Sequence, residues 1–284
     1  MRRVAALVGV VATLGALTAC GGAPGDDSAS GTNPGSVPPG MHIHAIARDP
    51  ASGALLLATH DGLYVSSDGP IARVGPAIDL MGFTVAGPGH FYASGHPSSG
   101  TNLPQPVGLI ESRDGGRTWS TTSRGGKSDF HALTYSAGGI VAFDGLLRTS
   151  EDGRRWRIGE LPSAPSWLAG SLDHVIVLAT TAQGLLRSTD AGATWRPVSD
   201  PPSLVLVDWA ARGQVVGIDA GGELHVSGDA GMTWQATDLS TEGATALASS
   251  GSQDDLEILV ATERGVLVSR SLAPFVPAIL ATGR

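Results

Sequence analysis

The octapeptide Ser-Arg-Asp-Gly-Gly-Arg-Thr-Trp at residues 112–119 recurs as Ser-Thr-Asp-Ala-Gly-Ala-Thr-Trp at 188–195 and as Ser-Gly-Asp-Ala-Gly-Met-Thr-Trp at 227–234. A copy one residue shorter, Ser-Glu-Asp-Gly-Arg-Arg-Trp, occupies residues 150–156. The central aspartates Asp114, Asp152, Asp190 and Asp229 follow one another after 38, 38 and 39 residues. This period is the length of one four-stranded blade of a β-propeller.

Each residue type in the motif suits a tight turn between two strands. The aspartate accepts hydrogen bonds from the turn amides, the glycine adopts positive φ, and the tryptophan fills space between packed layers. We therefore expect structural roles for the four box residue pairs: Asp114 and Trp119, Asp152 and Trp156, Asp190 and Trp195, Asp229 and Trp234.

The segments before each box also repeat. Five units carry a Gly-Leu or Gly-Val pair, at Gly62-Leu63, Gly108-Leu109, Gly145-Leu146, Gly184-Leu185 and Gly265-Val266. It follows a β-rich run, at residues 55–59, 91–94, 140–143, 175–180, 214–218 and 258–262. Another apolar segment precedes that run, beginning near His44, Met81, His131, Trp167, Val205 and Thr245.

Six such units are present, and the first and last lack a complete box, as expected where a ring closes. The first has Ser-Ser-Asp-Gly at residues 66–69 without a tryptophan. The sequence predicts an all-β fold, a propeller of four-stranded antiparallel blades, with six blades favoured and seven as the alternative.

The box resembles the Asp-box, or BNR repeat, of sialidase-like propellers, and the resemblance covers residues 41–284. The segments His-Ile-His-Ala, Ala-Thr-His-Asp-Gly-Leu, Ser-Gly-His-Pro and Asp-Phe-His-Ala are similar to those of bacterial secreted propellers loosely labelled glycosyl hydrolases. Sialidase activity is not expected, because the Arg-Ile-Pro motif of many sialidases is missing and the arginines lie mostly in or after the boxes.

The first forty residues resemble an export signal and a tether. Arg2 and Arg3 precede an apolar run at 4–16, and Leu-Thr-Ala-Cys at 17–20 is similar to a bacterial lipobox, which predicts a signal peptide at 1–20 and lipidation of Cys20. Residues 21–40, rich in Gly, Pro and Ser, are expected to form a flexible tether before the propeller at 41–284. The expected location is the outer face of the bacterial cytoplasmic membrane, held there by the lipid.

Composition narrows the partners. Cys20 is the single cysteine, so the mature protein forms no internal disulfide or thiolate metal cluster. The formal net charge is −8 and basic clusters are absent, which argues against a nucleic-acid partner. A small molecule, a glycan or a protein remains as the expected ligand.

Several histidines fall at repeat-equivalent places. Within a blade, the start of the first strand and the turn after the second strand lie on the same face of the ring. The strand starts on this face carry His42, His44, Met81 and His131. The turns on the same face carry His60, His96, Asp144, Asp219 and Glu263. Imidazole and thioether are ligands for zinc or copper, and methionine favours copper. The hypothesis is a metal or polar-ligand site formed by His42, His44, Met81, His96 and His131, with His60 as a weaker candidate.

Other interpretations stay open. The histidines can instead be structural, and Met81 can be core filling. A glycoside hydrolase would need two facing carboxyl groups, for which Asp61, Asp144, Asp219 and Glu263 are weak candidates. A protein-binding or assembly platform would need no catalytic residues. The insertion at 97–106 follows His96 and could cover the site. His90, His174 and His225 are expected at the surface, and Trp167 and Trp209 either pack in the core or line a pocket.

Overall fold

In the part of the chain that the structure describes, short apolar segments separated by glycine- and aspartate-containing turns form twenty-four β-strands. The computed structural model describes residues 41–67, 70–211, 213–252 and 254–278. Within these ranges, no helix has the length and apolar character needed to cross a membrane. The expected signal peptide, Cys20 and the tether at 21–40 lie outside the described residues.

Each blade is one four-stranded antiparallel sheet whose strands follow one another in chain order. Blades 1 to 3 contain β1 (Ile43–Arg48), β2 (Leu55–Thr59), β3 (Gly62–Ser66), β4 (Ala72–Val74), β5 (Ile78–Gly87), β6 (His90–Pro97), β7 (Leu109–Ser112), β8 (Ser120–Ser123), β9 (Ala132–Ser136), β10 (Gly139–Phe143), β11 (Leu147–Ser150) and β12 (Arg157–Gly159). Blades 4 to 6 contain β13 (Pro165–Gly170), β14 (Val177–Thr181), β15 (Gly184–Ser188), β16 (Arg196–Pro197), β17 (Leu204–Ala211), β18 (Gln214–Asp219), β19 (Glu223–Ser227), β20 (Gln235–Ser240), β21 (Ala244–Ser250), β22 (Glu257–Thr262), β23 (Gly265–Arg270) and β24 (Val276–Pro277).

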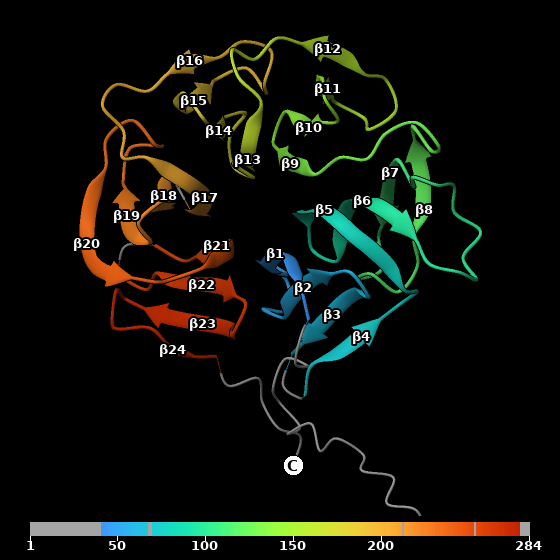
Figure 1. Ribbon diagram of the computed structural model, residues 1–284, viewed down its shortest axis with the longest axis horizontal. Coiled ribbons are helices and arrows are strands. Elements are labelled where there is room, and N and C mark those ends of the chain that lie inside the picture. The colour runs from blue at the N-terminus through green and yellow to red at the C-terminus, as the bar shows by residue number, and fades with distance from the viewer. Residues whose placement is uncertain (1–40, 68–69, 212, 253, 279–284) are drawn as a thin grey trace, which may run out of the picture. The chain divides into compact units, whose positions relative to one another are not determined.

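The six blades form a closed ring with their first strands innermost (Figure 1). Each inner strand contacts the inner strands of both neighbouring blades, and β1 contacts β21 where the ring closes. The Arg48 guanidinium crosses this closure to the Glu257 carboxylate, with an NH2 to Oε1 distance of 2.7 Å. The expected six-bladed propeller is confirmed, and the seven-bladed alternative is wrong.

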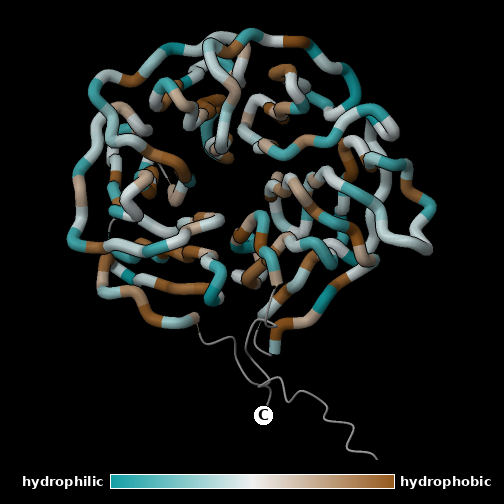
Figure 2. The backbone as a smooth tube through the Cα atoms, viewed as in Figure 1, coloured by the Kyte–Doolittle hydropathy of each residue, from teal (hydrophilic) through white to brown (hydrophobic). Residues whose placement is uncertain are grey.

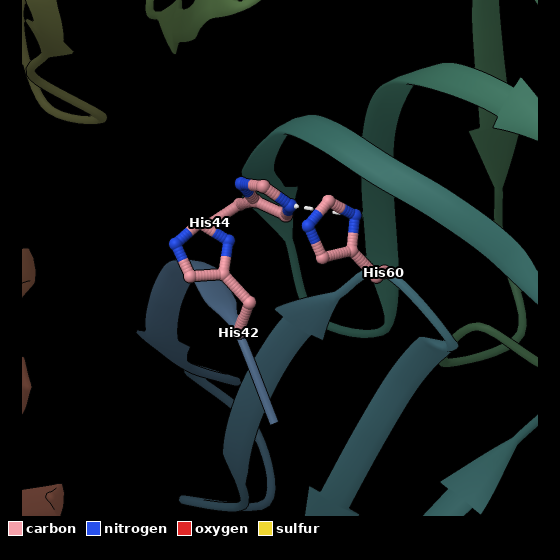
Figure 3. Close-up of side chains that lie close together, drawn as sticks. All are labelled: His42, His44 and His60. Carbon is pink, nitrogen blue, oxygen red and sulfur yellow. Dashed lines mark hydrogen bonds between the residues drawn. The ribbon is translucent and has the colours of Figure 1, made fainter. Parts of the chain in front are cut away.

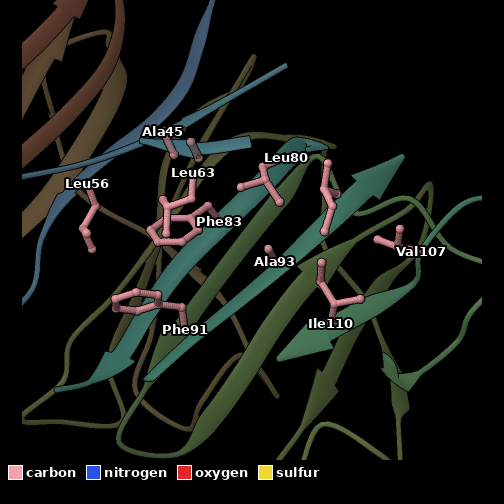
Figure 4. Close-up of a cluster of buried hydrophobic side chains, with 11 residues drawn as sticks. Ala45, Leu56, Leu63, Leu80, Phe83, Phe91, Ala93, Val107 and Ile110 are labelled. Atoms are coloured by element: carbon pink, nitrogen blue, oxygen red, sulfur yellow. The ribbon is translucent and has the colours of Figure 1, made fainter. Parts of the chain in front are cut away.

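The core lies between neighbouring blades. Apolar stretches occur in every blade (Figure 2), and β2 is buried along its whole length. Leu56 and Leu63 of blade 1 pack against Phe83 and Phe91 of blade 2 in one such cluster (Figure 4). Burial of one such side chain contributes about 1.5–3 kcal/mol, so the blade interfaces supply most of the stabilisation.

The aspartate-containing turns also join neighbouring blades. Asp114 Oδ1 accepts a hydrogen bond from the Thr118 amide at 2.9 Å, and Oδ2 accepts one from the Thr118 hydroxyl at 2.6 Å. Gly116 has φ +87°, and a Cβ there would lie 2.3 Å from Cδ2 of Leu63 in the preceding blade. The same contacts recur around Asp190 and Asp229, and Trp119, Trp156, Trp195 and Trp234 each pack against a buried cluster. The expected structural roles of these residues agree with this geometry.

One repeat is offset from its expected position. The pair Gly145-Leu146 was expected to start an apolar strand, but Leu146 is 48% exposed and Leu147 begins β11. Because side chains alternate across a strand, the extra residue moves Leu147, at 2% exposure, to the buried side.

Candidate functional site

A β-bulge defines one equivalent position near the start of most inner strands. The pairing of β1 with β2 skips His44, and the pairing of β5 with β6 skips Met81 in the same way. In blade 3 the pairing begins with Ala132 and Phe143, and His131, the residue before Ala132, aligns with His44 and Met81. In the other blades this position holds Ser166, Val205 and Thr245. The alignment of His44, Met81 and His131 expected from the sequence is therefore confirmed.

Two further positions share this mouth of the ring. One is two places before the bulge, and the other follows the second-strand position that aligns with Thr59, the partner of the residue just before the bulge. In blades 1 to 3 the three positions hold histidine, aspartate or methionine throughout, except for Gly145: His42, His44, His60, Asp79, Met81, His96, Asp129 and His131. In blades 4 to 6 they hold small or apolar residues, except for Glu263: Ala164, Ser166, Ala182, Ser203, Val205, Ala220, Gly243 and Thr245. We call the first set the histidine wall.

Three imidazoles of blade 1 meet at one end of this wall (Figure 3). His42, His44 and His60 each offer a ring nitrogen, and these atoms lie within 4.8 Å of one another. His44 Nε2 is 3.3 Å from His60 Nδ1. Asp79 of blade 2 completes the group, with Oδ1 at 2.8 Å from His60 Nδ1 and 3.6 Å from His44 Nε2. We call these four residues the blade 1 group.

The surroundings of His44 favour its neutral imidazole form. Burial, followed by repulsion from His60 and His42, lowers the pKa of His44 to about 4, against the opposing effect of Asp79. His44 is therefore neutral at pH 7, and a ring nitrogen lone pair is available. Neutral imidazole is the form of histidine that binds metal.

A second group lies further along the wall. Asp129 Oδ2 is 3.1 Å from His96 Nε2 and 2.8 Å from His131 Nε2. The insertion at 97–106 reaches this group through Gln105, whose Nε2 is 3.0 Å from His96 Nδ1. The loop expected to cover the site therefore touches it. His131 also contributes to lowering the pKa of His44, so the two groups sense each other electrostatically.

The sequence predicted a single site formed by some of the histidines and Met81. The structure instead shows two groups of histidines. His60 is central to the blade 1 group, although it was ranked as the weaker candidate. Asp79 and Asp129 were missed, although they stand two residues before Met81 and His131, as His42 stands before His44. That shared offset was the available signal.

The four carboxylates considered for catalysis come from four different blades. Asp61 and Glu263 are exposed. The register places Asp144 and Asp219 one residue earlier than His60, at the place of Thr59, so their expected alignment was wrong. The Thr59 hydroxyl caps its turn, and Asp219 does the same by accepting the Gly221 and Glu223 amides at 2.9 Å.

Asp144 and His225 are both held in ion pairs. Asp144 accepts the Arg148 Nε hydrogen bond at 2.9 Å and the Ser128 hydroxyl, and these contacts oppose the effect of burial and lower its pKa. His225 was expected at the surface but is 8% exposed, with Nε2 at 3.1 Å from Asp219 Oδ2. Glu223 completes a second cluster of possible metal ligands there, within a single hairpin of blade 5.

Comparison with known proteins gives the fold. No family model and no curated protein sequence matches the chain. A gluconolactonase from Xanthomonas campestris superimposes with a TM-score of 0.60 at 13% identity, covering 82% of this chain and 87% of the other. YCF48 bound to a D1 peptide gives 0.54 at 15% identity, covering 86% and 84%.

An ancestral GH74 enzyme gives a TM-score of 0.58 at 12% identity, covering 86% of this chain but 39% of the enzyme. The chain therefore spans about two fifths of the length of that protein. At identities this low, the similarity shows a shared β-propeller fold, on which several activities occur.

Proposed function

We propose that the protein binds a divalent transition metal ion, zinc or copper, at the blade 1 group. The observation that carries the proposal is the convergence of His42, His44 and His60, whose ring nitrogens lie within 4.8 Å. Two nitrogens bound at about 2.05 Å to a tetrahedral zinc lie about 3.3 Å apart. This is the distance from His44 Nε2 to His60 Nδ1.

Asp79 would act as the fourth ligand, because its Oδ1 lies 2.8 Å from His60 Nδ1, the nitrogen that would bind the metal. Three imidazoles and one carboxylate suit zinc or copper(II) and disfavour magnesium and calcium, which prefer oxygen ligands. Met81 occupies the bulge of blade 2, equivalent to His44, and a thioether ligand there would favour copper. The group lies at the mouth of the ring, open to solvent through His60, whose side chain is 51% exposed.

Cellular location is part of this proposal. Lipidation at Cys20 and the tether at 21–40 would hold the propeller on the outer face of the cytoplasmic membrane, where exported proteins encounter metal ions. A glycoside hydrolase and a protein-binding platform remain the alternatives. The dispersal of Asp61, Asp144, Asp219 and Glu263 over four blades favours metal binding over glycoside hydrolysis.

Elemental analysis of the purified protein after equilibration with zinc or copper and removal of free metal tests the proposal. We expect one equivalent of metal in the wild type and loss of that equivalent in the His44→Ala, His60→Ala double variant. The control is His174→Ala, which removes an exposed histidine outside the wall. Metal content equal in all three proteins, or no retained metal in any, would overturn the proposal.

A further inference from the structure

The ring encloses a second polar feature, in its axial cavity. The later residues of the inner strands from all six blades line a cavity of about 340 Å³, within the range of small-molecule sites. His42 and His44 lie at or before the bulge of β1, His60 follows β2, and none of the three is among the lining residues of the cavity. This cavity is therefore separate from the proposed metal site.

Asp208 is out of place in this lining. Three residues after the bulge, the other five blades carry alanine or threonine: Ala47, Thr84, Thr134, Ala169 and Ala248. The hydroxyls of Thr84 and Thr134 each accept a hydrogen bond from a backbone amide of the next blade. Tyr135 donates to Thr84 at 3.2 Å, and Gly170 donates to Thr134 at 2.8 Å. Asp208 Oδ2 accepts a hydrogen bond from the Ser249 amide at 2.6 Å in the same way, and also one from the Ser249 hydroxyl at 3.0 Å.

A threonine would therefore meet the structural need at this position without a charge. The carboxyl of Asp208 is unfavourable here, since removal from bulk water raises its pKa to about 7. Asp208 is half-buried, and an ionisable group in a cavity that exceeds what packing requires is a candidate for ligand binding.

The surroundings of Asp208 define the ligand. The rings of Tyr135, Trp167 and Trp209 line the same cavity. Trp167 also packs against the buried clusters on three sides of the ring, so its indole reaches across the centre. Aromatic faces next to a carboxylate attract cations that carry apolar groups.

Positive charge in the lining is already neutralised. Arg48 is the cationic lining residue among those described, and its guanidinium is bound by Glu257 at 2.7 and 2.8 Å and by the Gly53 carbonyl at 2.9 Å. Asp173 adds a second carboxylate at the cavity wall. The cavity therefore has an excess of negative charge when Asp208 is ionised.

We propose that the axial cavity binds a small organic cation, an amine or quaternary ammonium, with its charge at Asp208 and its apolar part against Tyr135, Trp167 and Trp209. The ligand and the site are independent of the metal site. The aromatic lining also provides the signal, since a bound cation would change the fluorescence of Trp167 and Trp209.

The experiment compares matched ligands that differ in charge. Choline is titrated against its neutral isostere 3,3-dimethylbutanol, and n-butylamine against n-butanol, with tryptophan fluorescence and calorimetry as readouts. We expect at least one cation to bind about tenfold more tightly than its neutral partner, the size of effect that one desolvated cation–aromatic and carboxylate contact provides.

The variant Asp208→Thr places at this position the residue type that blades 2 and 3 use, which preserves the contact to Ser249. It should fold as the wild type by thermal unfolding, retain metal binding, and lose about tenfold in affinity for the cation. The neutral isosteres should bind equally to both proteins. Equal binding of cation and isostere, unchanged cation affinity in Asp208→Thr, or no saturable binding of either cation would overturn the proposal.

Discussion

The two halves of the propeller mouth share one backbone design and differ in chemistry. Blades 1 to 3 and blades 4 to 6 present the same three positions, set by the inner-strand bulge and by the turn after the second strand. One half fills them with imidazole and carboxylate groups, and the other fills them mainly with alanine, serine, glycine and other uncharged residues. Ring closure and packing therefore do not require the histidines.

The largest expected effect concerns what the two halves have in common, the turns that join blades. In Gly116→Ala, the new Cβ would lie 2.3 Å from Leu63 Cδ2 at φ +87°. Overpacking and positive φ together should lower the free energy of unfolding by about 2–4 kcal/mol. Urea denaturation measures this change.

The control for that variant is Gly126→Ala, at φ +71° with no atom within 4 Å of the new Cβ. It should lose about 1 kcal/mol, the cost of positive φ alone. Equal losses in the two variants would show that the turn does not pack against the preceding blade as described.

The next effect separates the two groups of the histidine wall. Asp79→Asn removes the carboxylate 2.8 Å from His60 Nδ1 and should weaken zinc binding by about tenfold or more, because it removes the proposed fourth ligand. Asp129→Asn makes the same change between His96 and His131 and should alter the affinity by less than about threefold. Competition with a chromophoric chelator measures both, and equal effects would mean that the wall acts as one site.

A smaller effect tests the turns through pH. Hydrogen bonds from the Thr118 hydroxyl and amide lower the pKa of Asp114 to about 2. Because the folded-state pKa lies below the ordinary value of 3.8, the ionised carboxylate stabilises the fold above about pH 4, and this contribution is lost as the pH falls toward 2. Solvent screening limits it to about 1 kcal/mol.

Asp114→Asn should therefore lower the free energy of unfolding at pH 7 and approach the wild type near pH 2, as measured by urea denaturation across that range. Asp238→Asn, at an exposed carboxylate outside the boxes, should change stability little at either pH. A constant difference between wild type and Asp114→Asn at all pH values would contradict the role given to ionised Asp114.

The sequence predicted the framework well because the framework repeats. Four boxes and six strand patterns give the blade number, and the alignment of His44 with Met81 and His131 survives in the strand register. The grouping of the histidines was not predictable in the same way. It depends on contacts between blades, such as Asp79 with His60, which lie nineteen residues apart in different sheets.

Asp144 and Asp219 show why the turns after the second strands could not be aligned from the sequence alone. A turn-capping threonine and a turn-capping aspartate are interchangeable, so an acid near a repeat-equivalent histidine looked like part of the mouth. The prediction that His225 lies at the surface was wrong for a related reason, since its ring contacts Asp219 within the hairpin.

The metal site is assigned to the blade 1 group. Calorimetric titration of the wild type and three single variants with zinc and with copper tests this assignment. We expect one equivalent to bind the wild type, about hundredfold weaker binding to His60→Ala, and affinities within about threefold of the wild type for His131→Ala and His174→Ala. Absence of saturable binding to the wild type, or equal weakening by His60→Ala and His174→Ala, would contradict the account.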